Sequence, residues 1–165
     1  MRHAGSKRAL PLGLFLAVIA VAVPAGATSF HEDFTYYVRY HFNATAWDKP
    51  VAAVYVHTGV LVQASVPRGG QYFWEAVQHF PLALKDGHFF GKAMLRAYSA
   101  YEYQYVQGPR VQYWVYFRDG SSIVTEAYAI PAQRGNDQTR LEKAYLDASD
   151  SDATWCDFYS HATIS

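Results

Sequence analysis

Tryptophan and tyrosine are the residues of this chain whose types and spacing favour a defined chemistry. The 165 residues include 4 Trp, 14 Tyr and 10 Phe. Trp114 and Tyr116 alternate with the apolar residues of Val111–Phe117, and Tyr37 has the same relation to Phe34–Phe42. Alternation places these rings on the side of an extended segment opposite its apolar side chains. An exposed indole or phenol ring can stack on the C–H face of a sugar or pack in a protein interface.

More aromatic residues are present than one core can bury. Four tyrosines fall within residues 98–105, and Trp74 lies in another apolar segment. A sandwich core is only about 10 Å thick. We therefore predict a ligand-binding surface made of Trp114, Tyr116, Trp74 and Tyr103. The alternative is that both sheet faces are covered, one of them by the C-terminal segment, so that these rings only pack.

Catalytic chemistry has less support. A glycosidase needs two carboxylates that face each other across a sugar. Four carboxylates lie in or beside predicted strands, and the sequence does not pair any two of them: Glu75, Glu102, Asp119 and Glu126. The G-x-S-x-G motif of serine hydrolases is absent. We predict a non-enzymatic protein without a cofactor, with a polysaccharide-acting enzyme as the minor alternative.

The histidines show no metal-ligand spacing. Six of them follow the first segment: His31, His41, His57, His79, His88 and His161. There is no HxH or HExxH motif, and one cysteine does not build a zinc site. His41 and His57 lie on predicted strands and could meet in space, although ordinary strand histidines are the favoured interpretation. We predict no metal site.

Two single residues suggest covalent modification. Asn43-Ala44-Thr45 is an N-glycosylation sequon in a predicted loop, so Asn43 is a candidate glycan acceptor in an exported eukaryotic protein. Cys156 is the only cysteine, which excludes an internal disulfide. It favours either an intermolecular disulfide or a buried thiol that packs as a small apolar residue.

Residues 1–27 have the three parts of a cleavable signal peptide. Three basic residues precede the apolar run Leu10–Val23, and Ala25-Gly26-Ala27 follows as a small-residue cleavage site. The run is shorter than the roughly 20 residues of a membrane span, so an uncleaved anchor is less favoured. Cleavage leaves 11 Lys and Arg against 14 Asp and Glu, a formal net charge of −3. We predict a secreted, extracellular protein that binds neither nucleic acid nor membrane.

Residues 28–131 read as one β domain. Strands are expected at 34–42, 51–57, 60–66, 71–80, 89–98, 102–107, 111–117 and 122–130. Thr58-Gly59, Gly108-Pro109-Arg110 and Asp119-Gly120 predict turns between them. This spacing, without a βαβ rhythm, indicates an immunoglobulin-like antiparallel β-sandwich of about seven strands. Residues 132–165 are predicted to form a C-terminal tail with a short helix near 139–148 and an acidic, solvated stretch at 149–157.

Part of the chain resembles a known family. Lys49-Pro50-Val51 leads into Val54-Tyr55-Val56-His57, and the later segment Val111–Gly120 reads VQYWVYFRDG. These residues resemble a starch- or glycogen-binding carbohydrate-binding module of the glycogen-targeting type. The family usually continues into a Trp-Asp-Asn-Asn type motif, where this chain has Ser121-Ser122-Ile123-Val124. The resemblance therefore implies the sandwich fold more than a set of sugar-holding residues.

The function predicted from these observations is non-catalytic carbohydrate binding by a secreted module. The partner is expected to be a polysaccharide or glycan that stacks on exposed Trp and Tyr. The alternative is an extracellular adhesion or assembly module, in which the same rings contact another protein chain and Cys156 bridges the two chains.

Overall fold

The computed structural model describes residues 30–64, 70–100, 104–135, 137–147 and 154–164. The predicted signal peptide, Glu102 and Tyr103 lie outside these ranges. The helical segments are η1 (Ala44–Ala46) and α1 (Gln138–Asp147). The strands are β1 (Phe30–Asn43), β2 (Val51–Ala64), β3 (Tyr72–Pro81), β4 (Ala83–Lys85), β5 (His88–Ala100), β6 (Gln104–Phe117), β7 (Ser122–Val124), β8 (Tyr128–Ala129), β9 (Ala132–Arg134) and β10 (Trp155–Ile164). No helix in the described ranges has the length and apolar character of a membrane span.

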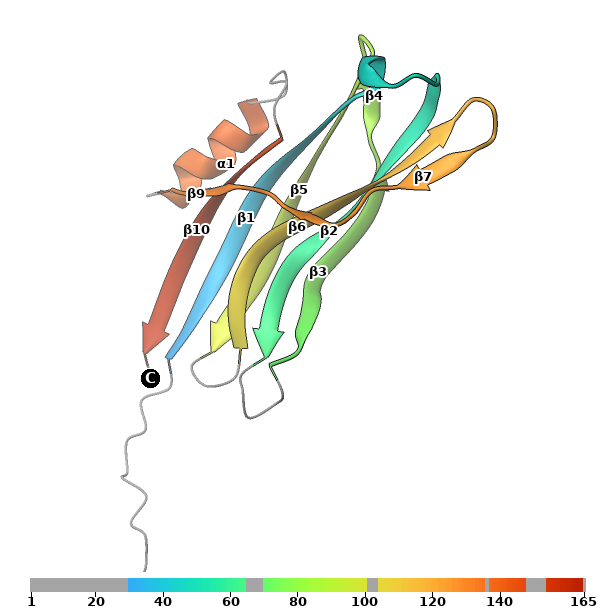
Figure 1. Cartoon of the computed structure of the whole chain (residues 1–165). Helices are drawn as coiled ribbons and strands as arrows, with labels where there is room; N and C mark the ends of the chain where they lie inside the picture. The colour runs from blue at the N-terminus through green and yellow to red at the C-terminus, as the bar shows by residue number, and fades with distance from the viewer. Residues whose placement is uncertain (1–29, 65–69, 101–103, 136, 148–153, 165) are drawn as a thin grey trace, which may run out of the picture.

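The strands form two layers. Their hydrogen-bonded order is β3-β2-β6-β5-β1-β10-β9, with β7 and β8 beside β6 and β4 beside β5. Neighbouring strands are antiparallel apart from β9 and β10, which are parallel. Between β5 and β6 the order depends on a single registered pair, Ala100 with Gln104, and there the sheet passes from one layer to the other. Figure 1 shows the long strands of both layers aligned along one axis.

Alternating side chains of the four longest strands fill the space between the layers. At its centre, the hydroxyl groups of Tyr40 on β1 and Thr58 on β2 lie 2.6 Å apart, and Thr58 donates to the Arg110 carbonyl at 2.8 Å. This buried polar pair is therefore satisfied. Other buried members of the core are Tyr36, Val38, Phe42, Val54, Val56, Val60, Val62, Leu95, Val111, Tyr113, Val115 and Phe117.

The structure confirms the mainly β, two-layered character and the short helix, but it has ten strands where about seven were expected. Two predicted turns are wrong. Thr58-Gly59 lies inside the continuous strand β2, and Gly108-Pro109-Arg110 lies inside β6. In each place the pairing register shifts, between Thr58 and Val60 and between Leu61 and Val62. These glycines accompany β-bulges, which bend a strand without ending it.

The C-terminal segment is part of the two-layered sheet. β10 pairs with β1 over ten residues, from Ile164 opposite Phe30 to Trp155 opposite Arg39. Asp137 caps α1, because its Oδ1 accepts from the Thr139 backbone nitrogen at 2.9 Å. Residues 155–157, predicted as acidic and solvated, are the start of β10. Residues 155–164, which were predicted as part of a tail, therefore form a strand of the second layer between β1 and β9.

Helix α1 covers the outer face of the second layer. Tyr37 points outward from β1, as its alternation predicts, yet it is only 1% exposed. Its hydroxyl donates to Glu142 Oε1 at 3.0 Å, and its ring centroid lies 5.7 Å from that of Tyr145. Lys92 of β5 donates to the Tyr145 carbonyl at 2.7 Å. For Tyr37, the alternative in which the C-terminal segment covers the sheet is the one observed.

Cys156 is buried in the second layer. It is 2% exposed and lies between Val38 of β1 and Ala132 of β9. Burial raises the pKa of its thiol, because a thiolate would lose its hydration there. This placement supports the buried thiol among the two alternatives and argues against an intermolecular disulfide.

We expect the Cys156 thiol to react far more slowly with an aromatic disulfide reagent in the folded protein than in denaturant. Attack requires a thiolate, and burial disfavours both the thiolate and access by the reagent. Reaction is to be followed by absorbance, with a non-reducing gel run on the same sample. A rapid reaction of the folded protein, or a covalent dimer that Cys156→Ser abolishes, would contradict this placement.

Candidate functional site

The outer face of β3, β2 and β6 has a continuous cluster of six rings. It is called the ring face below, and its residues are Tyr55 and His57 of β2, Trp74 and His79 of β3, and Trp114 and Tyr116 of β6. His57 lies between the two indoles, with ring centroids 5.6 Å from Trp74 and 6.3 Å from Trp114. His79 stacks on Tyr55 at 5.5 Å and meets Trp114 edge-on at 5.0 Å. Tyr55 also contacts Tyr116, at 5.7 Å.

Strand register brings these rings together. On β2, Tyr55 pairs with Trp114, while His57 pairs with His79 on one side and Gln112 on the other. Directly opposed residues of an antiparallel pair point to the same face. The buried valines of β2 and β6 alternate with these residues, so the core forces the rings outward.

A glycine makes room for one of the rings. A Cβ at Gly59 would lie 2.8 Å from the Glu75 carbonyl oxygen and 3.1 Å from Trp74 Cε3. The Trp74 indole therefore lies directly over the Gly59 backbone. Ala76, two residues after Trp74 on β3, has a φ of 51°, a left-handed conformation that is unusual for alanine. Glycine on one strand and a distorted partner strand together set the position of Trp74.

The ring face is accessible to a ligand. Tyr116 is 38% exposed, His79 is exposed, and the other four rings are half-buried. The Trp114 indole Nε1 is buried and has no hydrogen-bond partner among the described residues. The structure thus gathers three of the four predicted ligand-binding residues, Trp114, Tyr116 and Trp74, on one surface. Tyr103, the fourth, lies outside the described residues.

Tyr55, His57 and His79 are not among the residues predicted for this site. Each falls on a strand pattern that predicts its side of the sheet, but their proximity depends on register. The suggested meeting of His41 and His57 is wrong. His41 Nε2 lies 2.8 Å from His88 Nδ1 on the other layer, whereas His57 pairs with His79. Within the described ranges, no group of three or more His, Cys, Asp or Glu residues could hold a metal ion.

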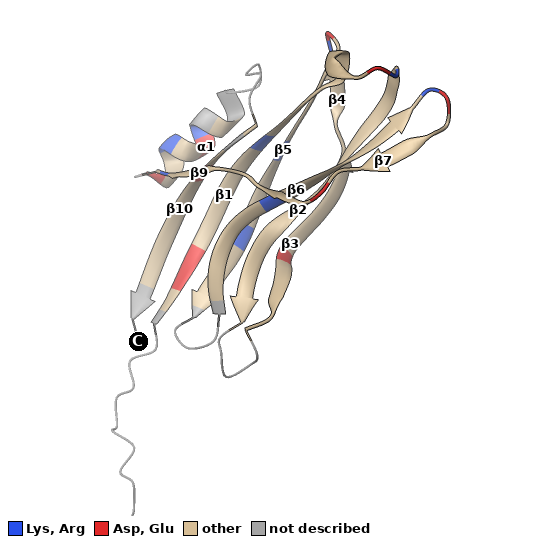
Figure 2. Ribbon diagram, in the orientation of Figure 1, with Lys and Arg blue, Asp and Glu red and all other residues tan. Residues whose placement is uncertain are grey.

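Charge is sparse around the ring face. Strand β2 contains no Lys, Arg, Asp or Glu, β6 contains only Arg110, and β3 contains only Glu75. Figure 2 shows these strands tan over nearly all their length, with charges concentrated at the loop ends and on other elements. Glu75 lines a cavity of about 420 Å³ together with Asp33 and Arg96 of the other layer. A ligand on the ring face therefore meets mainly aromatic and neutral polar groups.

Asp119 and Asn43, two other polar residues considered in the sequence, make hydrogen bonds within local turns. Asp119 Oδ1 accepts from the Ser121 backbone nitrogen at 2.9 Å, and Asp119 Oδ2 lies 2.9 Å from Lys49 Nζ. The Ser121 hydroxyl also donates to Asp119 Oδ1, at 2.5 Å. This hydrogen bond, followed by those from Lys49 and the Ser121 backbone, lowers the pKa of Asp119 and shapes the turn before β7. Asn43 is exposed, and its Oδ1 accepts from the Thr45 backbone nitrogen at 2.9 Å. Its glycosylation stays a prediction.

Two further cavities lie away from the ring face. Trp47, Lys49, Phe117 and Ile123 line part of a cavity of about 360 Å³ beside the β6–β7 turn. Trp47 is not among the predicted site residues, and its ring stacks on that of Phe42.

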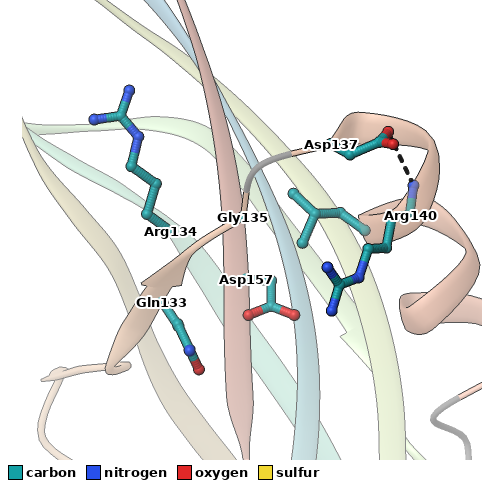
Figure 3. Close-up of a pocket in the computed structure, with 7 residues that line it drawn as sticks. Gln133, Arg134, Gly135, Asp137, Arg140 and Asp157 are labelled. Carbon is teal, nitrogen blue, oxygen red and sulfur yellow. Dashed lines mark hydrogen bonds between the residues drawn. The ribbon is translucent and has the colours of Figure 1, made fainter.

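The other cavity, of about 330 Å³, lies between β9, β10 and α1 (Figure 3). Burial raises the pKa of Asp157 there, and Arg140 opposes that shift. Asp137 is occupied in capping α1. The Arg134 guanidinium points away from these groups and contacts Ser160 at 2.8 Å and Glu32 at 3.8 Å (Figure 3). Arg140 and Asp157 then leave the cavity with one charge of each sign, so it favours neither an anionic nor a cationic ligand.

The ring face is therefore the surface that best combines accessible rings, neutral polar groups and a fixed backbone. The chain matches no protein-family model, no curated protein and no solved structure, so the assignment depends on this geometry alone.

Proposed function

We propose that the mature chain is a secreted, non-catalytic carbohydrate-binding module and that the ring face is its binding site. The observation that supports this most is the convergence of Trp74, Trp114 and Tyr116 on one accessible, nearly uncharged sheet face. The signal-peptide pattern of residues 1–27 supports export, and its cleavage belongs to the proposal.

The chemistry of the ring face suits a sugar. Indole and phenol rings offer flat apolar surfaces to the C–H faces of pyranose rings, and each ring also has a polar edge. His57, His79 and Gln112 lie in one row across the three strands and offer donors and acceptors to sugar hydroxyl groups. Apolar surface with a few fixed polar groups is typical of small-molecule sites.

The family resemblance adds two arguments. The segment that resembles the glycogen-targeting modules, Val111–Gly120, forms most of β6 and contains Trp114 and Tyr116. The two-layered sandwich suits such a module. Membership of that family and an immunoglobulin-like topology stay predictions.

Replacement of Trp114 tests the site. We expect Trp114→Ala to weaken binding to the best ligand of a glycan array by about 30-fold, since a buried aromatic anchor contributes roughly 2 kcal/mol or more. Tyr98→Ala is the matched control, because Tyr98 is 49% exposed on β5 of the other layer. Circular dichroism of both variants checks their folding.

Three outcomes separate the possibilities. Loss of binding in Trp114→Ala with retention in Tyr98→Ala supports the proposal. An unchanged pattern in both variants places the sugar elsewhere on the protein. The absence of any glycan that binds the unmodified protein would overturn carbohydrate binding itself.

A protein partner is the second candidate. Val124 pairs with Trp114 and is 52% exposed, and Val77 of β3 is 50% exposed. Apolar side chains beside aromatic rings are common in protein interfaces. Burial of Cys156 removes the disulfide bridge from this alternative. Concentration-dependent self-association that Trp114→Ala abolishes, without glycan binding, would favour it.

A further inference from the structure

We propose that the ring face binds a single, free glycan chain and does not bind the flat surface of a crystalline polysaccharide. This inference rests on the proposed carbohydrate-binding function and deepens it, because it names the physical form of the ligand. It follows from the orientation of the rings and from the shape of the strands beneath them.

Four of the rings take two steeply different orientations. The ring planes of Tyr55 and His79 are nearly parallel, with an angle of 12° between them. The Trp114 plane lies at 69° to that of His79, and the Tyr116 plane lies at 77° to that of Tyr55. Trp114 and Tyr116 therefore both stand steeply to the other two rings. No flat surface can lie against the faces of all four.

His57 has an intermediate tilt. Its ring plane lies at 43° to that of Trp114 and at 53° to that of His79. The Trp74 indole, on its other side, is inclined to it by 30°. The ring face is therefore a stepped surface, in which the orientation of the rings changes from one neighbour to the next.

The strands beneath the rings are bent as well. The pairing register of β2 shifts once against β3, between Thr58 and Val60, and twice against β6. Irregularities of this kind bend a strand and increase its twist. Figure 1 shows β2 and β6 curving along their length. Rotation of the side chains alone would therefore not align all the rings in one plane.

A free glycan chain can use both ring orientations. Each of its sugar units has apolar C–H faces and edges that bear hydroxyl groups, so a unit that stacks on one ring presents an edge to the next. His57 and Gln112 are half-buried and His79 is exposed, and their polar atoms can bond to those hydroxyl groups. In a crystalline polymer the surface is flat and the chains bond to one another, so only rings of one orientation could lie against it.

The test offers the full protein the same sugar in different physical forms. Cellulose, chitin and starch are each presented as a soluble hexasaccharide, as a swollen amorphous polymer and as the crystalline or granular solid. We expect one of these sugars to bind as hexasaccharide and as amorphous polymer, and at least about tenfold more weakly as the solid. Excess hexasaccharide should release the protein from the amorphous polymer. Tryptophan fluorescence measures binding in solution, and sedimentation with the polymer measures retention.

Two substitutions test the two ring orientations. Tyr116→Ala and His79→Ala should each weaken hexasaccharide binding about tenfold, because rings of both orientations contact the chain. Both side chains are exposed, so their removal should leave the fold intact, and circular dichroism checks this. Tyr98→Ala, on the other layer, is the matched control and should bind normally.

The outcomes distinguish this inference from the function on which it rests. Retention on a crystalline solid that its hexasaccharide does not reverse overturns the single-chain ligand and leaves carbohydrate binding intact. Loss of binding in only one of Tyr116→Ala and His79→Ala also overturns it, since a flat ligand needs one orientation alone. Failure to bind any of these forms, together with an empty glycan array, overturns the proposed function itself.

Discussion

Tyr37→Ala is expected to lower the free energy of unfolding by about 3–5 kcal/mol, the range for removal of a buried aromatic side chain. Tyr37 is 1% exposed between β1 and α1. Its loss removes the ring contact with Tyr145 and the hydrogen bond to Glu142. A short helix depends on tertiary packing of this kind, so α1 should no longer pack stably against the sheet.

Tyr37→Phe is the matched variant. It keeps the ring and removes only the 3.0 Å hydrogen bond to Glu142, which should cost about 0.5–1.5 kcal/mol. Urea unfolding gives both values from the midpoint at constant slope. Equal effects of the two variants would mean that packing of the ring against α1 contributes little. Sugar binding on the opposite layer should survive both substitutions.

Local alternation identified which side of each strand a residue occupies. The prediction that Trp114 and Tyr116 lie opposite the apolar set of β6 is confirmed, since Val111 and Val115 are fully buried while Tyr116 is exposed. This succeeds because successive side chains of a strand point to opposite faces, whatever surrounds the strand. The same pattern says nothing about what covers a face. Tyr37 points outward yet is buried, because a helix about a hundred residues later in the chain packs over it.

Glycine was the main source of error in the elements. Thr58-Gly59 and Gly108-Pro109 have the composition of turns, and both lie within long strands. Glycine also serves where a backbone must bulge or accept a close neighbour. At Gly59 that neighbour is the Trp74 indole, which arrives from a different strand. Only the pairing of β2 with β3 shows that Gly59 accommodates a close neighbour and does not form a turn.

The histidines of the site show the same limit. His57 and His79 lie on one face of neighbouring strands, and their proximity follows from the register of β2 with β3. His41 has a partner by the same logic, His88 across the β1–β5 pair. The sequence alone does not distinguish these pairs from any other pairing of two strand histidines. Register, which long-range packing of the valine core decides, selects the actual pairs.

Alkaline pH is expected to unfold this protein through its buried tyrosines. Burial raises the pKa of Tyr36, Tyr40 and Tyr113, because a phenolate loses its hydration in the core. Burial also raises the pKa of Tyr145 to about 12. A folded-state pKa above the unfolded value of about 10 means that the unfolded chain releases protons first. The stability that these groups provide is complete below about pH 10 and is lost as pH rises above it.

Tyr40→Phe isolates one of these groups. Near neutral pH the variant should be less stable by about 1 kcal/mol, because the bond between Tyr40 and Thr58 is lost while Thr58 still donates to the Arg110 carbonyl. Above pH 10 the unmodified protein loses about 1.4 kcal/mol per pH unit at Tyr40, and the variant does not. The two unfolding free energies should therefore cross about one unit above pH 10.

A matched core variant makes this crossing decisive. Val56→Ala removes buried apolar volume and keeps every tyrosine, so its deficit relative to the unmodified protein should persist through the alkaline range. Urea unfolding at increasing pH measures all three proteins, and tyrosinate absorbance should rise together with unfolding. Parallel curves for Tyr40→Phe and Val56→Ala would show that the Tyr40 phenol ionises within the folded protein. The hydroxyl pair that joins β1 to β2 would then be open to solvent, and the two layers would not be sealed at their centre.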